Sequence, residues 1–232
     1  MSIFNRENQY ISLLSQRPHS VKELSEKLFV SAPTVRRDIT ALEEKGLVTR
    51  KSGVVSIKST SPDQRIPLFV RHFEENESKQ AIAQKAAAHI KDGYVIMLDA
   101  STTAFCLLPH IAQLKNVLVI TNGAKTALEA ASMGIKTICT GGEITLESFS
   151  YVGHDAESVL SGYNADVAFF SCRGISDEGV VSDNSILENS MRKIMMKNSK
   201  KSYLLCDRSK LGKTYLNTLC RVKDLEAVIG DK

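Results

Sequence analysis

Two kinds of hydrophobic pattern divide the chain into two parts. In the first 58 residues, apolar side chains recur at helical spacing: Val35, Ile39 and Leu42 fall at i, i+4 and i+7 and form one stripe along a helix. From residue 94 onward, short apolar runs alternate with segments of helical length. The first pattern predicts a small helical unit, and the second predicts a larger unit built on a sheet.

The larger unit contains runs of strand length separated by helix-length segments. The runs are Tyr94–Leu98, Val117–Ile120, Thr137–Cys139, Val167–Phe170, Tyr203–Cys206 and Ala227–Ile229, and the predicted helices span 77–91, 103–114, 124–133, 154–161 and 185–199. The runs alternate little, which is typical of strands buried on both faces of a parallel sheet. We therefore expect an α/β domain with a mostly parallel sheet over residues 77–232.

Helix-start signals are closely spaced in the first part. Asn5–Ser15 has the pattern of a helix, and Ser20 followed three residues later by Glu23 has the spacing of a capping box. Ser31 is a good N-cap for a third helix, in which Pro33 takes an early position. Two helices joined by about three to four residues, with the second one displayed, are typical of a helix-turn-helix.

A short basic hairpin is predicted after the third helix. Leu47–Arg50 and Val54–Ile57 are strand-like runs on either side of Lys51-Ser52-Gly53. Together with the three helices, this hairpin predicts a winged helix-turn-helix over residues 1–58. A linker and a connecting helix are expected over residues 59–76.

The third helix presents hydroxyls and cations away from its apolar stripe. We expect contacts with double-stranded DNA from Ser31, Pro33, Thr34, Arg36, Arg37, Arg50 and Lys51. Charge supports this assignment, because residues 1–60 contain ten Lys and Arg against six Asp and Glu, whereas residues 61–232 contain twenty of each. The net charge of +4 therefore lies on the predicted DNA-binding unit.

Residues 6–57 resemble the DNA-binding domain of the DeoR family of bacterial repressors. The resemblance rests on Val30-Ser31, Thr34-Val35-Arg36-Arg37-Asp38-Ile39, Leu42-Glu43, Gly46-Leu47-Val48 and Arg50. Many members carry His-Gly-Gly after the wing arginine, where this chain has Lys51-Ser52-Gly53. The resemblance implies a repressor that binds operator DNA.

Small, polar and cationic residues follow five of the predicted strands. Ligands of parallel sheets bind beyond the carboxyl ends of the strands, so these residues are candidates for a binding site. The candidates are Asp99, Ser101, Thr102, Thr103, Asn122, Gly141, Gly142, Arg173, Gly174, Asp207 and Lys210. Hydroxyls and free amides at a helix start suit an anion, which Arg173 or Lys210 would neutralise.

The chemistry of these candidates fits a phosphorylated polyol. Asp99, Asn122 and Asp207 would bind sugar hydroxyls, while the cations and the hydroxyl-rich turn would hold the phosphate. A purely structural interpretation competes with this one. In it, Asp99 and Asp207 only cap helices or close turns, and Gly141-Gly142 is only a turn.

This part of the chain resembles the effector-sensing domain of the DeoR family, which is related in fold to ribose-5-phosphate isomerase. The matching residues are Asp99, Ser101-Thr102-Thr103, Thr121-Asn122, Gly141-Gly142, Gly153, Asp166, Phe169, Arg173-Gly174, Gly179, Asp207, Ser209-Lys210 and Gly212. The resemblance implies that a sugar phosphate binds here and alters operator affinity. Ala100 stands where the isomerases usually have Gly.

The alternative function is an active sugar-phosphate isomerase with a DNA-binding appendage. Aldose–ketose isomerisation needs a general base and an acid. The isomerases carry a carboxylate cluster after the strand that corresponds to Val167–Phe170, whereas Ser171-Cys172-Arg173-Gly174 follows it here. Glu188 remains as a base without an evident partner. We therefore expect a non-enzymatic regulator of carbohydrate metabolism.

Other function classes lack sequence support. The five cysteines form no Cys-x-x-Cys pair, which indicates reduced thiols in a cytoplasmic protein. No His, Cys or Glu spacing matches a metal-ligand set, so no metal and no cofactor are expected. The chain has no signal peptide and no apolar run near 18 residues, so we expect no membrane contact. A homodimer or higher homo-oligomer is expected, because one such module reads few base pairs.

Overall fold

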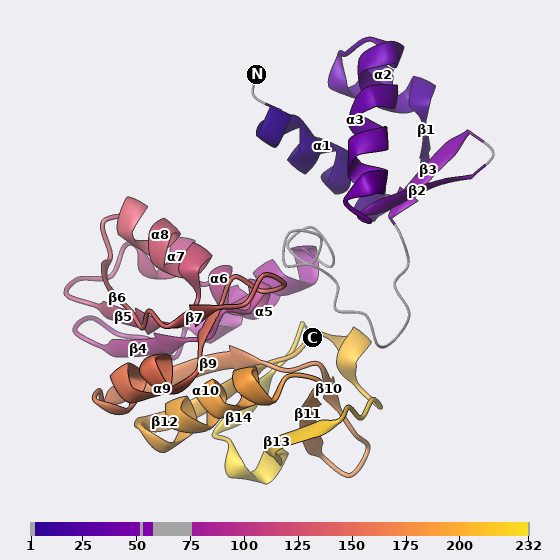
Figure 1. The fold of residues 1–232 in the computed structure, drawn as a ribbon. Helices are drawn as coiled ribbons and strands as arrows, with labels where there is room; N and C mark the ends of the chain where they lie inside the picture. The colour runs from indigo at the N-terminus through magenta and orange to yellow at the C-terminus, as the bar shows by residue number, and fades with distance from the viewer. Residues whose placement is uncertain (1–2, 52, 58–75, 232) are drawn as a thin grey trace. The chain divides into compact units, whose positions relative to one another are not determined.

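The chain forms two compact units, Met1–Glu74 and Glu75–Lys232, in the computed structural model (Figure 1). The structure describes residues 3–51, 53–57 and 76–231. The predicted linker and connecting helix over 59–76 lie outside these residues, apart from Asn76, where α5 begins.

The described residues of the first unit form three helices and a small antiparallel sheet. Its elements are α1 (Ile3–Gln16), β1 (His19–Ser20), α2 (Val21–Leu28), α3 (Ala32–Glu44), β2 (Val48–Lys51) and β3 (Val54–Ile57). The predicted helices and hairpin are thus confirmed. The predictions did not include β1, which pairs with β3 so that the strand order is β1-β3-β2.

Two side-chain caps set the turn between α2 and α3. Ser20 and Glu23 form the predicted capping box: the Glu23 amide donates to Ser20 Oγ at 3.2 Å, and Glu23 Oε2 accepts from the Ser20 amide at 2.7 Å. Phe29 ends α2 in the left-handed region, at φ +53°. Ser31 then caps α3 by accepting from the Thr34 amide at 3.4 Å. These local bonds present α3 as the second helix of a helix-turn-helix.

The second unit is built on a six-stranded parallel sheet. The strands are β4 (Val95–Leu98), β5 (Leu118–Thr121), β6 (Lys136–Cys139), β9 (Ala165–Ser171), β12 (Ser199–Leu205) and β14 (Ala227–Ile229). Their order is β14-β12-β9-β4-β5-β6, and every neighbouring pair is parallel. All six predicted strands are therefore confirmed as members of one sheet.

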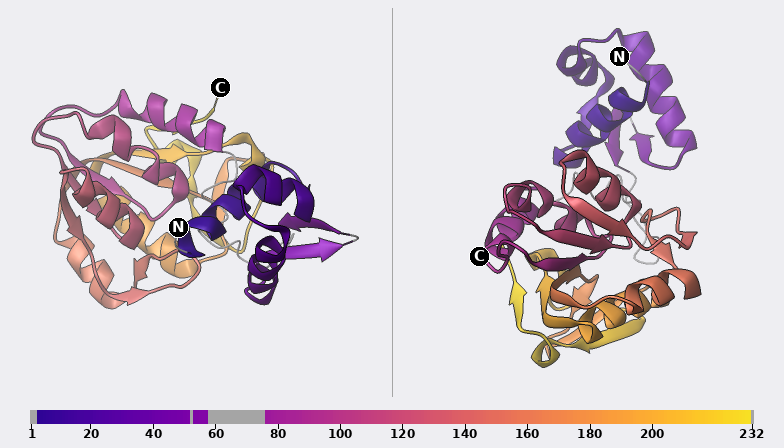
Figure 2. Two further views of the ribbon diagram at one scale, coloured as in Figure 1. Left: turned by 90° about the horizontal axis from the view of Figure 1, so that it is seen from above. Right: turned by 90° about the vertical axis from the view of Figure 1, so that its left-hand side faces the viewer.

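Helices cover both faces of this sheet (Figure 2). The apolar cluster on one face joins the sheet to α5 (Asn76–Ala87), α6 (Thr102–Phe105), α7 (Leu108–Ile111) and α8 (Ala124–Ser132). The cluster on the other face joins the sheet to α9 (His154–Ser161) and α10 (Ile186–Lys197). Covered faces explain why the strands are continuously apolar.

Two predicted helix boundaries were wrong. The predicted helix over 77–91 ends at Ala87, because the last turn tightens: the amides of His89 and Ile90 donate to carbonyls three residues back. The predicted helix over 103–114 is two four-residue helices. Pro109 lies in the first turn of α7 and has no amide proton to continue the helix from α6.

Two small antiparallel sheets were not predicted. A hairpin joins β7 (Glu143–Ile144) to β8 (Tyr151–Val152), and a three-stranded sheet has the order β10-β11-β13. The strands of the latter are β10 (Gly174–Ile175), β11 (Val180–Asp183) and β13 (Asn217–Arg221). Two 3₁₀ turns, Arg208–Lys210 and Val222–Asp224, complete the second unit.

Candidate nucleic-acid interface and effector site

The helix α3 separates buried apolar side chains from exposed cations. Val35 and Ile39 are fully buried, while Arg36 and Arg37 are exposed. The acid that follows them, Asp38, accepts from Arg6 Nε at 3.1 Å and from the Tyr10 hydroxyl at 3.3 Å. Asp38 is thus paired within the unit. Arg36 and Arg37 form no ion pair with any residue that the structure describes.

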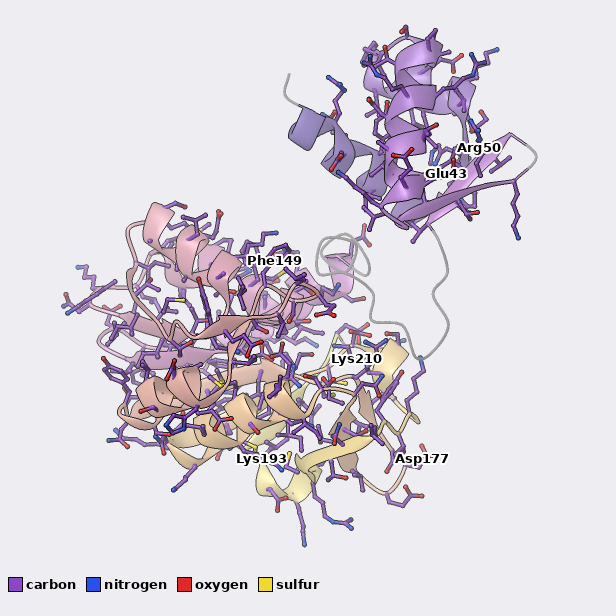
Figure 3. All side chains as sticks on the ribbon, in the orientation of Figure 1. Glu43, Arg50, Phe149, Asp177, Lys193 and Lys210 are labelled. Carbon is purple, nitrogen blue, oxygen red and sulfur yellow. The ribbon has the colours of Figure 1, made fainter. Side chains whose placement is uncertain are left out.

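The wing is tied to α3 by a carboxylate. Glu43 Oε1 accepts from the Arg50 amide at 2.8 Å, and these two residues lie together in Figure 3. The side chains of Arg50 and Lys51 are exposed on β2. The arrangement therefore holds a second set of cations at a fixed place relative to α3.

The remaining predicted DNA contacts lie at the start of α3. Ser31 Oγ and Thr34 Oγ1 are 2.8 Å apart, so the two hydroxyls bond to each other as well as capping the helix. Pro33 is exposed beside them. The predicted Ser31, Pro33, Thr34, Arg36 and Arg37 thus share the exposed amino-terminal half of one helix.

The candidate effector residues follow neighbouring strands at one edge of the parallel sheet. Leu98 is paired in register with Thr121 and with Phe169, so the loops that begin at Asp99 and Asn122 leave the sheet side by side. A Cβ atom on Gly123 would lie 3.0 Å from the Cα of Ala100, which shows how closely these two loops pack. The edge is therefore a compact surface of loop residues.

Asp99 lies at the centre of a buried charge network. Its Oδ1 accepts from the Ser101 amide at 3.1 Å, and its Oδ2 accepts from the Ser171 amide at 3.2 Å and from Arg192 Nε at 3.0 Å. Arg192 also donates from Nη1 to Asp183 at 2.8 Å. Burial would lower the pKa of Arg192, but the charges of Asp183 and Asp99 outweigh it and raise that pKa. Both Asp99 oxygens are therefore occupied.

Lys210 places a cation at the ends of β9 and β12. Its Nζ donates to Ser171 Oγ at 2.7 Å and lies 3.5 Å from Asp207 Oδ2. Asp207 also accepts from the amide and hydroxyl of Ser209. Burial would raise the pKa of Asp207, but the charge of Lys210 and the hydrogen bonds from Ser209 together outweigh it and hold that pKa below its usual value.

Three predicted site residues carry buried polar atoms that lack partners. Within the described parts of the chain, the unpaired buried side-chain atoms are His19 Nε2, Thr103 Oγ1, Asn122 Oδ1 and Arg173 Nε. The amide of Asn122 is oriented by its Nδ2, which donates to the Tyr151 carbonyl at 3.1 Å. Leaving such an atom unpaired costs about 1–3 kcal/mol, so a bound ligand that pairs it gains affinity.

The other predicted residues have mainly structural contacts. Ser101 Oγ accepts from the Ala104 amide and so caps α6, whose first turn also holds the buried Thr102. Gly141 and Gly142 have positive φ angles, and a Cβ on Gly142 would lie 3.0 Å from the Val152 carbonyl. A Cβ on Gly174 would lie 2.5 Å from the Lys213 carbonyl. These glycines permit close packing of the loops.

Two charged residues near this edge were not among the predicted effector-binding residues. Lys79 of α5 is 5% exposed, and its charge is among those that lower the pKa of Asp207. Its place three and four residues before the buried Ile82 and Ala83 was a usable signal. Glu188 was considered only as the base of the isomerase alternative, and its Oε1 accepts from two serine hydroxyls of the unpredicted β7–β8 hairpin.

The described residues contain neither a metal-binding cluster nor a membrane-spanning helix. Among the described residues, no three His, Cys, Asp or Glu side chains are grouped so that they could hold a metal ion. Over the same residues, every helix is too short or too polar to span a bilayer.

Each of the two units matches a known protein family. Residues 6–60 match the model of the DeoR-like helix-turn-helix domain, and residues 74–232 match that of the DeoR C-terminal sensor domain. The chain is 34% identical to the HTH-type transcriptional regulator GolR of Listeria innocua, over 98% of this chain and 90% of the relative. It is 30% identical to the lactose phosphotransferase system repressor of Staphylococcus epidermidis (100% and 93%) and 29% identical to the L-fucose operon activator of Escherichia coli (95% and 91%).

A solved structure shares the fold of about two thirds of the chain. The delta subunit of eIF2B from Chaetomium thermophilum matches with a TM-score of 0.51 and 16% identity, over 68% of this chain and 57% of that one. Ribose 5-phosphate isomerase from Plasmodium falciparum matches with a TM-score of 0.44 and 20% identity, over 59% and 52%. Both family models and the relatives together cover nearly the whole length. The chain therefore belongs to the DeoR family of helix-turn-helix transcriptional regulators.

Proposed function

We propose that this regulator represses a carbohydrate-metabolism operon and that a phosphorylated sugar, bound at the edge of the sensor sheet, changes its affinity for operator DNA. The observation that carries the sensor half of this proposal is the set of unpaired buried atoms at that edge. They include an acceptor, Asn122 Oδ1, and a donor, Arg173 Nε. A ligand that satisfies both must offer a hydrogen-bond donor and a hydrogen-bond acceptor.

A phosphorylated sugar has both kinds of group. Its phosphate would accept from Arg173 and be attracted by Lys210, whose ammonium is held at the ends of β9 and β12. Its hydroxyls would donate to Asn122 Oδ1 and bond with Thr103 Oγ1. In this proposal Asp99 acts indirectly, because both of its oxygens are already bonded.

The DNA-binding half of the proposal rests on charge and exposure. Arg36, Arg37, Arg50 and Lys51 are exposed cations on α3 and the wing, and Asp38 is turned inward. Exposed arginines on the second helix suit phosphates and guanine edges in the major groove. Two or more copies would bind together, because one module of this kind covers only a half-site.

The isomerase alternative has weaker support. The carboxylates Asp99 and Asp207 are held by Arg192 and Lys210, so neither is an unengaged base. Cys172 and Arg173 directly follow β9, and the first acid after this strand is Asp177. We therefore propose a receptor that binds its sugar phosphate unchanged. Turnover of a bound sugar phosphate in a coupled assay would contradict this part of the proposal.

A thermal-shift screen tests the effector site. A sugar phosphate at 100 times its dissociation constant is expected to stabilise the protein by about 2.7 kcal/mol. Lys210→Met is expected to abolish most of that shift, because the phosphate loses a partly buried cation. Lys193→Met is the matched control: Lys193 is an exposed lysine of α10, and Figure 3 shows it far from the labelled Lys210. Equal shifts in the two variants would remove Lys210 from the site.

A further inference from the structure

We infer that Glu188 binds hydroxyl groups of the effector and so determines which phosphorylated compounds bind to the sensor unit. This inference rests on the proposed function. It adds a residue that is absent from the expected set of site residues, and it assigns that residue to the sugar end of the ligand rather than to the phosphate end.

The position of Glu188 follows from the topology of the sheet. It lies in the first turn of α10, and α10 leads into the parallel strand β12. In such a crossover the helix runs back against the strands, so its first turn lies at their carboxyl edge. Ser185 caps the helix by accepting from the Glu188 amide at 3.2 Å. Glu188 is 8% exposed, so its carboxylate is nearly enclosed at the candidate edge.

The two oxygens of this carboxylate differ. Oε1 accepts from Ser148 Oγ at 2.7 Å and from Ser150 Oγ at 2.5 Å. Oε2 has no hydrogen-bond partner among the described residues, and it is not one of their fully enclosed unpaired atoms. A carboxylate is an acceptor only, so Oε2 is suited to a hydroxyl donor supplied from outside the protein.

The β7–β8 hairpin, which carries Ser148 and Ser150, joins Glu188 to Asn122, whose Oδ1 is also an unpaired acceptor. Ser150 forms a β-bridge with Gly123, and the Tyr151 amide donates to the Asn122 carbonyl at 2.6 Å. Segment 148–151 therefore contacts Glu188 through its hydroxyls and Asn122 through its backbone. Glu188 Oε2 and Asn122 Oδ1 are two acceptors held by one short segment. A ligand that fills both must supply two hydrogen-bond donors, and a sugar phosphate supplies them as two hydroxyl groups.

Local charge places the phosphate elsewhere. Arg192 lies one turn after Glu188, but its Nε and Nη1 donate to Asp99, Asp183 and Asn189. Glu188 is therefore the third carboxylate around a single guanidinium, and it would repel a phosphate. The cations of the edge, Lys210 and Arg173, suit the anionic end. The geometry assigns a polyhydroxy phosphate ester with its hydroxyls toward Glu188.

The test compares hydroxyl discrimination in matched variants. A panel of ribose 5-phosphate, fructose 6-phosphate and glucitol 6-phosphate identifies a probe that binds the wild-type protein, and calorimetry then compares this probe with its monodeoxy analogues. We expect one analogue to bind the wild-type protein about 10-fold more weakly, as is usual for a lost hydrogen bond to a charged group. Glu188→Gln is expected to bind the parent probe about 10-fold more weakly and to lose the discrimination against that analogue.

Glu178→Gln is the matched control, because Glu178 also accepts from a serine hydroxyl, Ser176, but in an exposed turn. This variant is expected to bind like the wild-type protein. If Glu188→Gln fails to fold, Ser148→Ala replaces it, with a smaller loss of the same discrimination. Unchanged discrimination in the folded Glu188 or Ser148 variant would overturn the inference. If no sugar phosphate binds the wild-type protein, the proposed function itself fails.

Discussion

Replacing Arg36 and Arg37 together by alanine is expected to weaken binding to the operator by about 100-fold or more. Each side chain is exposed on α3 and has no ion pair within the described residues, so each is available to a phosphate or a guanine. Contacts of this kind are each worth about 1–3 kcal/mol. The measurement is fluorescence anisotropy with a labelled promoter fragment at several salt concentrations.

The salt dependence distinguishes the two roles of these arginines. Loss of a phosphate contact reduces the slope of log K against log salt by about 1 per arginine, whereas loss of a guanine contact relaxes a base preference. Lys45→Ala is the control in the same unit, because Lys45 lies beyond the other end of α3 and pairs with Glu7 at 2.5 Å. Unchanged binding in both single arginine variants would contradict the assignment of α3 as the recognition helix.

Arg192→Met is expected to destabilise the sensor unit by about 3–5 kcal/mol. Methionine fills much of the same volume but leaves the buried Asp99 and Asp183 without their cation, and an uncompensated buried charge is strongly destabilising. The measurement is urea denaturation at neutral pH. Arg208→Met is the control, because Arg208 is half exposed in its contact with Asp231. That exposed pair is worth at most about 1 kcal/mol.

At acid pH, the difference in free energy of unfolding between Arg192→Met and the wild-type protein is expected to become smaller. Burial would raise the pKa of Asp183, but Arg192 outweighs it, so that pKa is lower in the folded than in the unfolded state. A lowered carboxyl pKa stabilises the fold above the unfolded value of about 3.9 and loses this effect as the pH falls through the folded value. The variant lacks this stabilisation. Protonation of Asp99 and Asp183 removes their uncompensated negative charge, so the variant loses less stability in acid than the wild-type protein does. A difference that stays constant from pH 7 to acid would contradict the role of the network.

Local signals were sufficient for much of the fold. The Ser20 and Ser31 caps and the apolar stripe of α3 depend on residues within one or two turns, and the structure confirms them. The six parallel strands were recognisable because a sheet covered on both faces is continuously apolar. Pro109 was also a local signal, and it should have divided the helix predicted over 103–114.

Several of the missed strands are too short to produce a hydrophobic pattern. The strands β1, β7 and β10 are two residues long, so no periodicity could reveal them.

The candidate site also has a part that was predictable from the sequence and a part that was not. Residues after the strand ends were found by position, and three of them, Thr103, Asn122 and Arg173, carry unpaired buried atoms. The side-chain contacts around the site were not predictable, because they join distant residues: Asp99 and Arg192 are 93 residues apart, and Ser150 and Glu188 are 38 apart.

Competition binding of the full-length protein to its own promoter region tests the central claim most directly. The promoter fragment competes against random fragments, with and without the sugar phosphate found by the thermal-shift screen. We expect a preference for the promoter of about 10³-fold or more, and a change in that affinity of about 5-fold or more when the sugar phosphate is added. Equal affinity for promoter and random DNA under both conditions would contradict the claim that one unit binds an operator under the control of the other.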